Sequence, residues 1–291
     1  MFSGSFVALI TPFRDGRVDV KELRALVEFQ IANGTNGLVP CGTTGETATM
    51  NEQEDELVIS TVIEATAGRV PVVAGTGSND TRKAIQYTKM AQRLGADGAL
   101  MVTPYYNKPT QEGLYLHYRA VAEETDIPII PYNVPGRTSV NLLPETVARL
   151  SQIKNIVAIK EASGNLEQIS SVVRLCGAGF NVLSGDDGLT LPVLSVGGAG
   201  VISVTANVLP GPVSEMCRAW TQGNTRRALE IHHYLADLTK ALFLETNPIP
   251  VKTAAGLMGM CSGEMRLPLC PMSDANLRKL KEVLSAYGML K

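Results

Sequence analysis

The feature that most constrains the fold of this chain is a regular alternation of short apolar runs with segments of helical period. Eight apolar or β-branched runs recur along most of its length, at residues 6–10, 37–40, 70–74, 99–102, 128–132, 156–160, 181–183 and 201–204. Several of them are apolar throughout, which is typical of parallel strands covered on both faces. The first five begin about 30 residues apart, the length of one strand–helix–strand unit.

The segments between these runs carry helix start and stop signals. Asp19 and Asn51 each precede a glutamate by three residues, which is the spacing of a capping box. An apolar stripe follows each cap and predicts the buried face of a helix. Its members are Leu23, Leu26, Val27 and Ile31 in the first helix and Leu57, Val58 and Val62 in the second. Gly34, Gly68 and Gly95 then serve as stop signals.

Eight such units predict an α/β fold, the (β/α)8 or TIM barrel, because eight parallel strands with right-handed crossovers close with their helices outside. The alternative is an open doubly wound sheet. Its dinucleotide signature G-x-G-x-x-G does not follow the first run, where residues 11–16 read TPFRDG. We expect residues 1–209 to form the barrel with the catalytic site. Residues 210–291 read as C-terminal helices, comprising the last barrel helix and a helical cap.

The composition is that of an ordinary globular protein, with 45% hydrophobic and 19% charged residues and a net charge of −2. No run of lysine or arginine suits a nucleic acid or an anionic membrane surface. The apolar runs are shorter than the ~18 residues of a membrane span, and the first residues show no secretion signal, so we expect a cytoplasmic protein. Five cysteines without a C-x-x-C spacing argue against a disulfide framework and structural zinc.

Lys160 is the strongest chemical signal, because it closes the apolar run 156–160 and catalysis in a barrel takes place where strands end. Strand geometry places Lys160 and the next residue, Glu161, on opposite faces, so Glu161 is not expected to neutralise it. At a pKa of ~10.4 only about one amine in 2,500 is unprotonated at pH 7, whereas burial that lowers the pKa to ~8 raises this to about a tenth. Lys160 is therefore a Schiff-base lysine, or else a structural cation paired with a distant acid.

The loop after the second run, residues 42–46, reads GTTGE. Two glycines around Thr43 and Thr44 allow backbone N–H groups to converge on a carboxylate, and the hydroxyls offer a proton relay. A plain tight turn is the alternative interpretation.

Two further strand ends carry polar side chains. Tyr132 ends the fifth run and Arg137 follows it, which places a phenol and a guanidinium near the barrel mouth. The phenol can donate or accept a proton, and the guanidinium can hold a carboxylate with two parallel hydrogen bonds. Tyr105 and Tyr106 follow the fourth run in a proline-bounded loop and could bring a third hydroxyl. Each of these residues could instead serve packing or lie in solvent.

Metal chemistry is not expected. Asp186 and Asp187 follow the seventh run, but the three histidines, at positions 117, 232 and 233, fall in helical patterns away from strand ends. The glycine-rich segment 197–200 precedes the eighth run, at the end of the barrel opposite the predicted site. We expect no metal and no organic cofactor.

Together these motifs resemble the 4-hydroxy-tetrahydrodipicolinate synthase (dihydrodipicolinate synthase) family, within the class I pyruvate-dependent lyases. The resemblance runs essentially from end to end. The segments that carry it are residues 42–46 (GTTGE), 103–107 (TPYYN), 132–138 (YNVPGRT), 159–162 (IKEA), 184–187 (SGDD), 200–203 (GVIS) and 247–252 (NPIPVK). The order and length of these segments make chance similarity very improbable.

The resemblance implies the catalytic roles. Lys160 corresponds to the lysine that forms a Schiff base with pyruvate, and Tyr132 to the proton donor and acceptor. Thr43 and Tyr106 match its relay partners, with Tyr106 reaching the site of a neighbouring subunit.

The resemblance also implies the substrates. Thr44, Ile202 and Gly185 match substrate-binding positions around pyruvate, and Arg137 matches the residue that holds the carboxylate of L-aspartate 4-semialdehyde. Members of the family make 4-hydroxy-tetrahydrodipicolinate in lysine biosynthesis through diaminopimelate and are typically homotetramers, dimers of dimers. No cofactor is implied.

Two other functions remain open. A sister aldolase, such as N-acetylneuraminate lyase or a 2-keto-3-deoxy sugar-acid aldolase, shares the lysine, the tyrosine and the glycine-bracketed loop. Arg137 favours an amino-acid aldehyde, which carries a carboxylate, over a sugar chain. A non-catalytic barrel that senses pyruvate or lysine is the more remote alternative, against which the intact lysine, tyrosine and threonine set argues.

One departure from the family concerns regulation. Feedback-inhibited members carry histidines at the positions of Glu52 and Asp55 and a glutamate at that of Lys83. Lys83 would meet the ammonium group of the inhibitor lysine with like charge, although Asn79 and Tyr105 are retained. We expect weak or absent inhibition by lysine.

Overall fold

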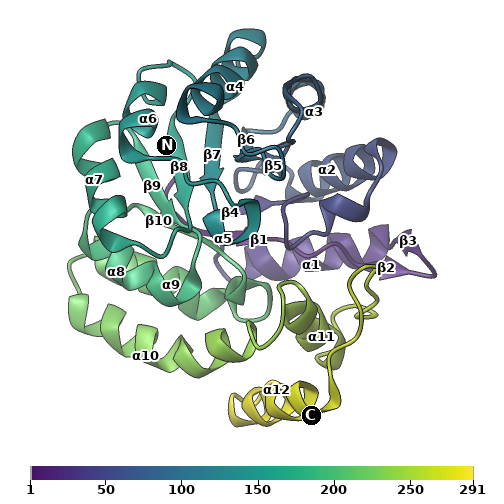
Figure 1. Ribbon diagram of the computed structural model, residues 1–291. Coiled ribbons are helices and arrows are strands. Elements are labelled where there is room, and N and C mark those ends of the chain that lie inside the picture. Colours follow the sequence, from purple (N-terminus) through teal and green to yellow (C-terminus); the bar gives the residue numbers. More distant parts are fainter. Residues whose placement is uncertain (1, 291) are drawn as a thin grey trace. The chain divides into compact units, whose positions relative to one another are not determined.

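The structure, a computed structural model, describes residues 2–290. Along this range parallel strands alternate with helices (Figure 1), which confirms the predicted (β/α)8 fold class. The parallel strands are β1 (Gly4–Ala8), β4 (Gly37–Val39), β5 (Val73–Gly75), β6 (Gly98–Val102), β7 (Ile129–Asn133), β8 (Ala158–Glu161), β9 (Asn181–Ser184) and β10 (Gly200–Ser203). An antiparallel hairpin consists of β2 (Phe13–Arg14) and β3 (Arg17–Val18).

Helices follow the strands and continue to the C-terminus. The α-helices are α1 (Val20–Ala32), α2 (Glu52–Thr66), α3 (Thr81–Leu94), α4 (Gln111–Glu124), α5 (Pro135–Thr138), α6 (Pro144–Leu150), α7 (Leu166–Cys176), α8 (Thr190–Ser195), α9 (Pro210–Thr221), α10 (Thr225–Ala241), α11 (Ile249–Leu257) and α12 (Asp274–Ala286). Short 3-10 turns are η1 (Thr47–Thr49), η2 (Asp187–Leu189) and η3 (Thr205–Asn207).

The chain divides into two units, each with its own dense set of contacts. Unit 1 comprises the residues up to Gly4 together with 71–202, and unit 2 comprises 5–70 together with the residues from 203 onward. These units are defined by the contacts between residues, whereas the predicted boundary separates a barrel at 1–209 from C-terminal helices at 210–291. The predicted boundary is therefore not tested and stays a prediction.

Unit 1 carries six of the parallel strands, hydrogen-bonded in the order β10-β9-β8-β7-β6-β5. The register matters for the site, because Tyr132 on β7 lies directly opposite Lys160 on β8. The next residues, Asn133 and Glu161, form the following pair. Two residues predicted to be catalytic are thus neighbours at the carboxyl ends of adjacent strands.

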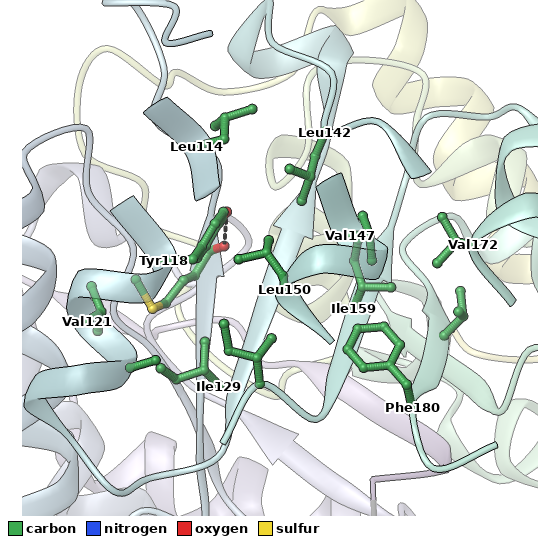
Figure 2. Packing of buried hydrophobic residues seen from close by; sticks show 14 of the residues in the cluster. Leu114, Tyr118, Val121, Ile129, Leu142, Val147, Leu150, Ile159, Val172 and Phe180 are labelled. Atoms are coloured by element: carbon green, nitrogen blue, oxygen red, sulfur yellow. Dashed lines mark hydrogen bonds between the residues drawn. The ribbon is translucent and has the colours of Figure 1, made fainter. Parts of the chain in front are cut away.

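The core of unit 1 lies between these strands and the helices α4, α6 and α7 (Figure 2). Leu114, Tyr118 and Val121 recur at helical spacing and form the buried face of α4. The Tyr118 hydroxyl donates to the Met101 carbonyl at 3.0 Å, so this phenol is satisfied inside the core. Burial holds the pKa of Tyr118 well above its ordinary value.

Unit 2 contains β1 paired with β4, the hairpin β2–β3, and the helices at both ends of the chain. Helix α1 packs against α2, α9 against α10, and α12 against both α10 and α11. Asn51 and Glu54 form the predicted capping box at the start of α2, and the Asp19 side chain caps α1 by accepting from the Glu22 N–H.

The predicted strands and helices are confirmed within a few residues, with one wrong assignment inside α2. Val58 and Val62 are buried as expected, whereas Leu57 is 42% exposed. Leu57 precedes Val58 by one position and is therefore turned about 100° away from it around the helix, off the buried face.

Among the helices of residues 2–290, none has the length and apolar character needed to cross a membrane.

Candidate active site

Lys160 lies at the carboxyl end of β8 and its side chain is 5% exposed. The pKa of this lysine falls from 10.5 to about 8, chiefly because burial disfavours the ammonium form. Arg137 lowers the pKa further, and Asp187 acts in the opposite direction. A substantial fraction of this amine is therefore unprotonated near neutral pH, as a nucleophilic lysine requires.

Tyr132 packs directly against this amine. The Lys160 Nζ lies 4.2 Å from the centroid of the Tyr132 ring, as the register of β7 and β8 dictates. Burial raises the pKa of Tyr132 to about 12, which keeps the phenol protonated at neutral pH. A protonated phenol beside a partly neutral amine can donate a proton and take it back during a reaction.

Glu161 does not serve as the ion-pair partner that its position in the sequence might suggest. Its carboxylate accepts hydrogen bonds from the Ser163 N–H at 2.7 Å, from Asn133 Nδ2 at 3.0 Å and from Gln168 Nε2 at 3.2 Å. The prediction that Glu161 faces away from Lys160 is consistent with these partners.

Gly185 follows β9 and leaves room for the lysine. A Cβ atom built on Gly185 would lie 3.0 Å from the Lys160 Cε atom and 2.7 Å from the Ala162 Cβ atom. A side chain at this position would force Lys160 or its strand to move, so the glycine is required by close approach. Ile202 is buried on β10, two strands from β8 in the order of unit 1.

Arg137 belongs to the short helix α5, which follows β7, and lies on its exposed side. The guanidinium is close enough to lower the pKa values of both Lys160 and Tyr132. A positive charge that acts on both the amine and the phenol is well suited to attract a substrate carboxylate.

Tyr105 and Tyr106 lie in the loop after β6. The Tyr105 carbonyl accepts from Asn79 Nδ2 at 3.1 Å, which ties this loop to the one before α3. Tyr106 has a left-handed backbone with φ 72° and a side chain that is 91% exposed. A large aromatic residue in this conformation is uncommon outside functional loops.

Thr43 and Thr44 lie in unit 2, in a loop that turns twice within itself. The Gly45 N–H donates to the Gly42 carbonyl and the Glu46 N–H donates to the Thr43 carbonyl, both at 3.1 Å. These two N–H groups are therefore used by the turns. The Thr44 hydroxyl accepts from Asn247 Nδ2 at 2.9 Å, so a residue of the C-terminal part of the chain holds this threonine in place.

A buried ion pair beneath this loop was not predicted from the sequence. Lys252 on α11 pairs with Glu46, and both side chains are fully buried. The other Glu46 oxygen accepts from the Arg266 N–H at 3.2 Å, and the Arg266 guanidinium binds Glu54 at 2.5 Å. The only sequence signal was a lysine inside an otherwise apolar helical stretch after Asn247.

Within residues 2–290, no group of three or more His, Cys, Asp or Glu side chains is placed to hold a metal ion. Burial lowers the pKa of His117 on α4 to about 4, while His232 and His233 lie on α10.

A desolvated lysine packed against a buried phenol, at the carboxyl ends of adjacent parallel strands, defines a barrel site of the imine-forming class. The model of the dihydrodipicolinate synthetase family matches residues 1–287, and the chain belongs to this family. The 4-hydroxy-tetrahydrodipicolinate synthase of Citrifermentans bemidjiense is 58% identical over 290 residues, a coverage of 100% for both chains.

Solved structures of dihydrodipicolinate synthases are similar to this chain over nearly its whole length. The crystal structure of dihydrodipicolinate synthase from Aquifex aeolicus is 54% identical, with a TM-score of 0.98 over 99% of both chains. A structure described as the first monomeric dihydrodipicolinate synthase variant is 48% identical, with a TM-score of 0.98 over 99% of this chain and 98% of the other.

Proposed function

We propose that this chain is a lyase that condenses pyruvate, held as a Schiff base on Lys160, with L-aspartate 4-semialdehyde. The product is 4-hydroxy-tetrahydrodipicolinate, in the diaminopimelate route of lysine biosynthesis. The main evidence is the buried Lys160 amine, whose pKa is lowered to about 8 and which lies 4.2 Å from the centroid of the Tyr132 ring. The names of relatives that match over the whole chain support the choice of substrates.

The first steps use the properties of Lys160. Its neutral amine adds to the pyruvate carbonyl and water leaves, which gives a protonated imine. This imine withdraws electrons, so a proton is lost from the pyruvate methyl group and an enamine forms. Tyr132 is the proposed donor and acceptor in these proton transfers, and Thr43 and Tyr106 the proposed relay.

The later steps need the second substrate. The enamine carbon attacks the aldehyde carbon of the semialdehyde, and the new alkoxide takes a proton. The amino group of the same substrate then attacks the imine carbon, which closes the ring and releases Lys160. We assign Arg137 to the carboxylate of the semialdehyde, and Thr44, Gly185 and Ile202 to pyruvate binding.

We also propose that the protein works as a cytoplasmic homotetramer, a dimer of dimers. The proposal requires Tyr106 to reach a neighbouring subunit, and its side chain, 91% exposed on a left-handed backbone, is accessible for such a contact. Sedimentation at several protein concentrations tests this state, and a monomer at micromolar concentration contradicts it.

Borohydride reduction in the presence of pyruvate tests the central proposal. We expect a covalent pyruvate adduct on the Lys160 peptide, and none in Lys160→Ala. Arg137→Ala is expected to keep the adduct and to raise the KM for the semialdehyde at least about tenfold, the effect of losing about 1.4 kcal/mol of binding. Absence of an adduct in the unmodified protein rejects the imine mechanism.

Parallel assays distinguish the sister aldolases. We expect turnover with pyruvate and L-aspartate 4-semialdehyde, and little or none with N-acetylneuraminate or a 2-keto-3-deoxy sugar acid. Preference for a sugar acid would reassign Arg137 and the second substrate while leaving the role of Lys160 intact. Adduct formation without turnover of any aldehyde would favour a binding protein.

We further propose weak or absent inhibition by lysine. Lys83 is exposed on α3, where its charge repels an incoming ammonium group. Asp55 is buried and accepts a hydrogen bond from the Thr47 hydroxyl at 3.0 Å, so it is occupied within the chain. Half-inhibition by lysine well below about 1 mM, which corresponds to more than ~4 kcal/mol of binding, contradicts this expectation.

A further inference from the structure

The residues immediately after Tyr132 and Lys160 are the buried pair of a polar network on the other face of their strands. Side chains alternate along a strand, so Asn133 and Glu161 point away from the face that carries the phenol and the amine. They are direct partners in the register of β7 and β8, and neither is more than 1% exposed. A contact between them fixes the strand pair at the position of the site.

Each polar atom of this network has a defined partner. Asn133 Nδ2 donates to Glu161 Oε2 at 3.0 Å and to Asn141 Oδ1 at 2.9 Å. Gln168 Nε2 donates to Glu161 Oε2 at 3.2 Å and to Asn141 Oδ1 at 3.0 Å. Asn141 Nδ2 donates in return to Gln168 Oε1 at 2.8 Å.

Two backbone groups determine which way the network is oriented. The Leu142 N–H donates to Asn133 Oδ1 at 2.9 Å, so the Asn133 amide cannot turn over without leaving that donor unpaired. The Ser163 N–H donates to Glu161 Oε1 at 2.7 Å. The Asn133 amino group is thereby held toward Glu161, which must present an acceptor.

We propose that Asn133 and Glu161 are positioning residues, whose buried amide–carboxylate contact holds Lys160 sheltered against the Tyr132 ring. The inference deepens the proposed function, on which its catalytic meaning rests. A break in this contact loosens the carboxyl ends of β7 and β8, exposes the amine to water and removes the phenol from its neighbour. Asp187 and Arg137, the charged groups that act on Lys160, stay unchanged in the tests below.

Each single variant places like groups opposite each other at this contact. In Glu161→Gln, the new amide keeps the Ser163 N–H bond only if its amino group faces that of Asn133, donor against donor. In Asn133→Asp, two carboxylates face each other in a buried site, which is costly when both are charged and requires the uptake of a proton to relieve. Both singles should therefore part the two strands.

The double variant Asn133→Asp/Glu161→Gln removes the conflict. The carboxylate introduced at position 133 would accept from the Leu142 N–H as before, and the amide introduced at position 161 would now donate to that carboxylate. If the Asn141 and Gln168 amides both turn over, the side-chain hydrogen bonds that now end on Glu161 Oε2, Asn141 and Gln168 return with donor and acceptor exchanged. Only the longer contact from Asn133 Nδ2 to Glu161 Oε1, at 3.3 Å, is lost. The double variant therefore separates this contact from general damage.

Competitive labelling with trace acetic anhydride from pH 6.5 to 10.5, read at the Lys160 peptide by mass spectrometry, measures the titration of this amine without substrate. Each single variant should move the pKa of Lys160 from about 8 toward the ordinary 10.5 by at least about one unit. Borohydride trapping with pyruvate at pH 7.5 should fall at least about eightfold in parallel, because the neutral fraction of the amine falls by that factor. The double variant should return both readouts to within about threefold of the unmodified protein.

Asn155→Asp is the matched control, because Asn155 lies just before β8, at the opposite end of the strand. Its Nδ2 donates to the Thr125 carbonyl at 2.8 Å and to the Ala122 carbonyl at 3.1 Å. This variant should lower the melting temperature and leave the Lys160 titration unchanged.

The outcomes decide between positioning and plain structural support. Single variants that melt earlier while Lys160 titrates as in the unmodified protein overturn the proposal, and so does a folded double variant without recovery. If the singles fail to fold, a folded double variant with a normal Lys160 titration supports it. Absence of a pyruvate adduct in the unmodified protein rejects the proposed function alone, because the titration is read without pyruvate.

Discussion

Within residues 2–290 the chain buries two lysines, Lys160 and Lys252, and the groups that contact their amines differ. Lys252 pairs with Glu46, and its Nζ lies 4.0 Å from the centroid of the Phe13 ring. Lys160 Nζ lies 4.2 Å from a ring as well, but that ring carries a hydroxyl group. The Lys252 amine thus contacts a carboxylate, and the Lys160 amine contacts a phenol ring.

The difference assigns the two lysines to different tasks. Burial lowers the pKa of both, and at Lys252 the adjoining Glu46 carboxylate works against that effect and stabilises the charge. An ammonium that is paired and fully buried is a structural cation, whereas an amine that titrates near pH 8 is a nucleophile. Burial of a lysine therefore does not reveal its role, and the group placed next to it does.

Lys252→Met should have the largest effect on stability. The change leaves the Glu46 carboxylate buried without its cation, and breaking a buried pair in this way costs about 3–5 kcal/mol. Chemical denaturation at pH 7 measures this loss in the free energy of unfolding. Glu46→Leu in the Lys252→Met background is the control, because removing both charges should recover most of the loss. If Lys252→Met alone were as stable as the unmodified protein, the ion pair between Lys252 and Glu46 would not stabilise the fold.

Lys160→Met should act in the opposite direction. The cost of keeping this amine buried is present below pH 8 and disappears as the pH rises from about 8 to 10.5, because its pKa is lower in the folded state than in the unfolded chain. The pKa falls from 10.5 to about 8, and each unit corresponds to about 1.36 kcal/mol, so replacement by methionine should stabilise the protein by roughly 3 kcal/mol at pH 7 and by little at pH 10.5.

Denaturation of Lys160→Met at both pH values, and at several protein concentrations to account for subunit association, checks this prediction. A loss of stability at pH 7 comparable to that of Lys252→Met would erase the distinction between the two lysines. The variant should form no pyruvate adduct in either case.

The sequence distinguishes these lysines only in part. Lys160 could be singled out because it closes an apolar strand, where a charge is out of place and barrel chemistry takes place. Lys252 lies in a helical pattern, and its partner Glu46 is 206 positions away in the chain, so no local pattern connects them. The same holds for Asn133 and Glu161, whose contact depends on the register of β7 and β8.

The fold was more predictable than the network behind the site, because its signals are local. The capping box of Asn51 and the cap at Asp19 each extend over three residues, and the strands are short apolar runs. Leu57 was assigned wrongly because an apolar residue one position outside the stripe looks the same in the sequence. The role of Tyr106 depends on a second copy of the chain and stays a prediction.

The pH dependence of imine formation should separate the two lysines further. Only the neutral amine attacks a carbonyl, so trapping with pyruvate should rise about tenfold for each pH unit up to about 8, where Lys160 titrates, and then level off. The initial rate of borohydride-trapped adduct at subsaturating pyruvate, from pH 6 to 9.5, measures this curve. Lys252→Met should follow the same curve if it folds. A rate that still rises tenfold per unit at pH 9.5 would mean that Lys160 is not a desolvated amine.

Phe13→Leu should have the smallest effect, confined to the structural lysine. The Phe13 ring faces two cations, Lys252 at 4.0 Å and Arg266 at 4.2 Å from its centroid, and it is buried in β2. Loss of the ring should cost about 1–2 kcal/mol, part of it from the smaller side chain and part from the cation–π contacts. Phe180→Leu, in the apolar core of unit 1, is the control. It changes side-chain volume in the same way and therefore measures the cost of the smaller side chain without any cation–π contact. The excess for Phe13 should be about 0.5–1 kcal/mol, and imine formation on Lys160 should be unchanged in both variants, because neither ring touches the amine that reacts.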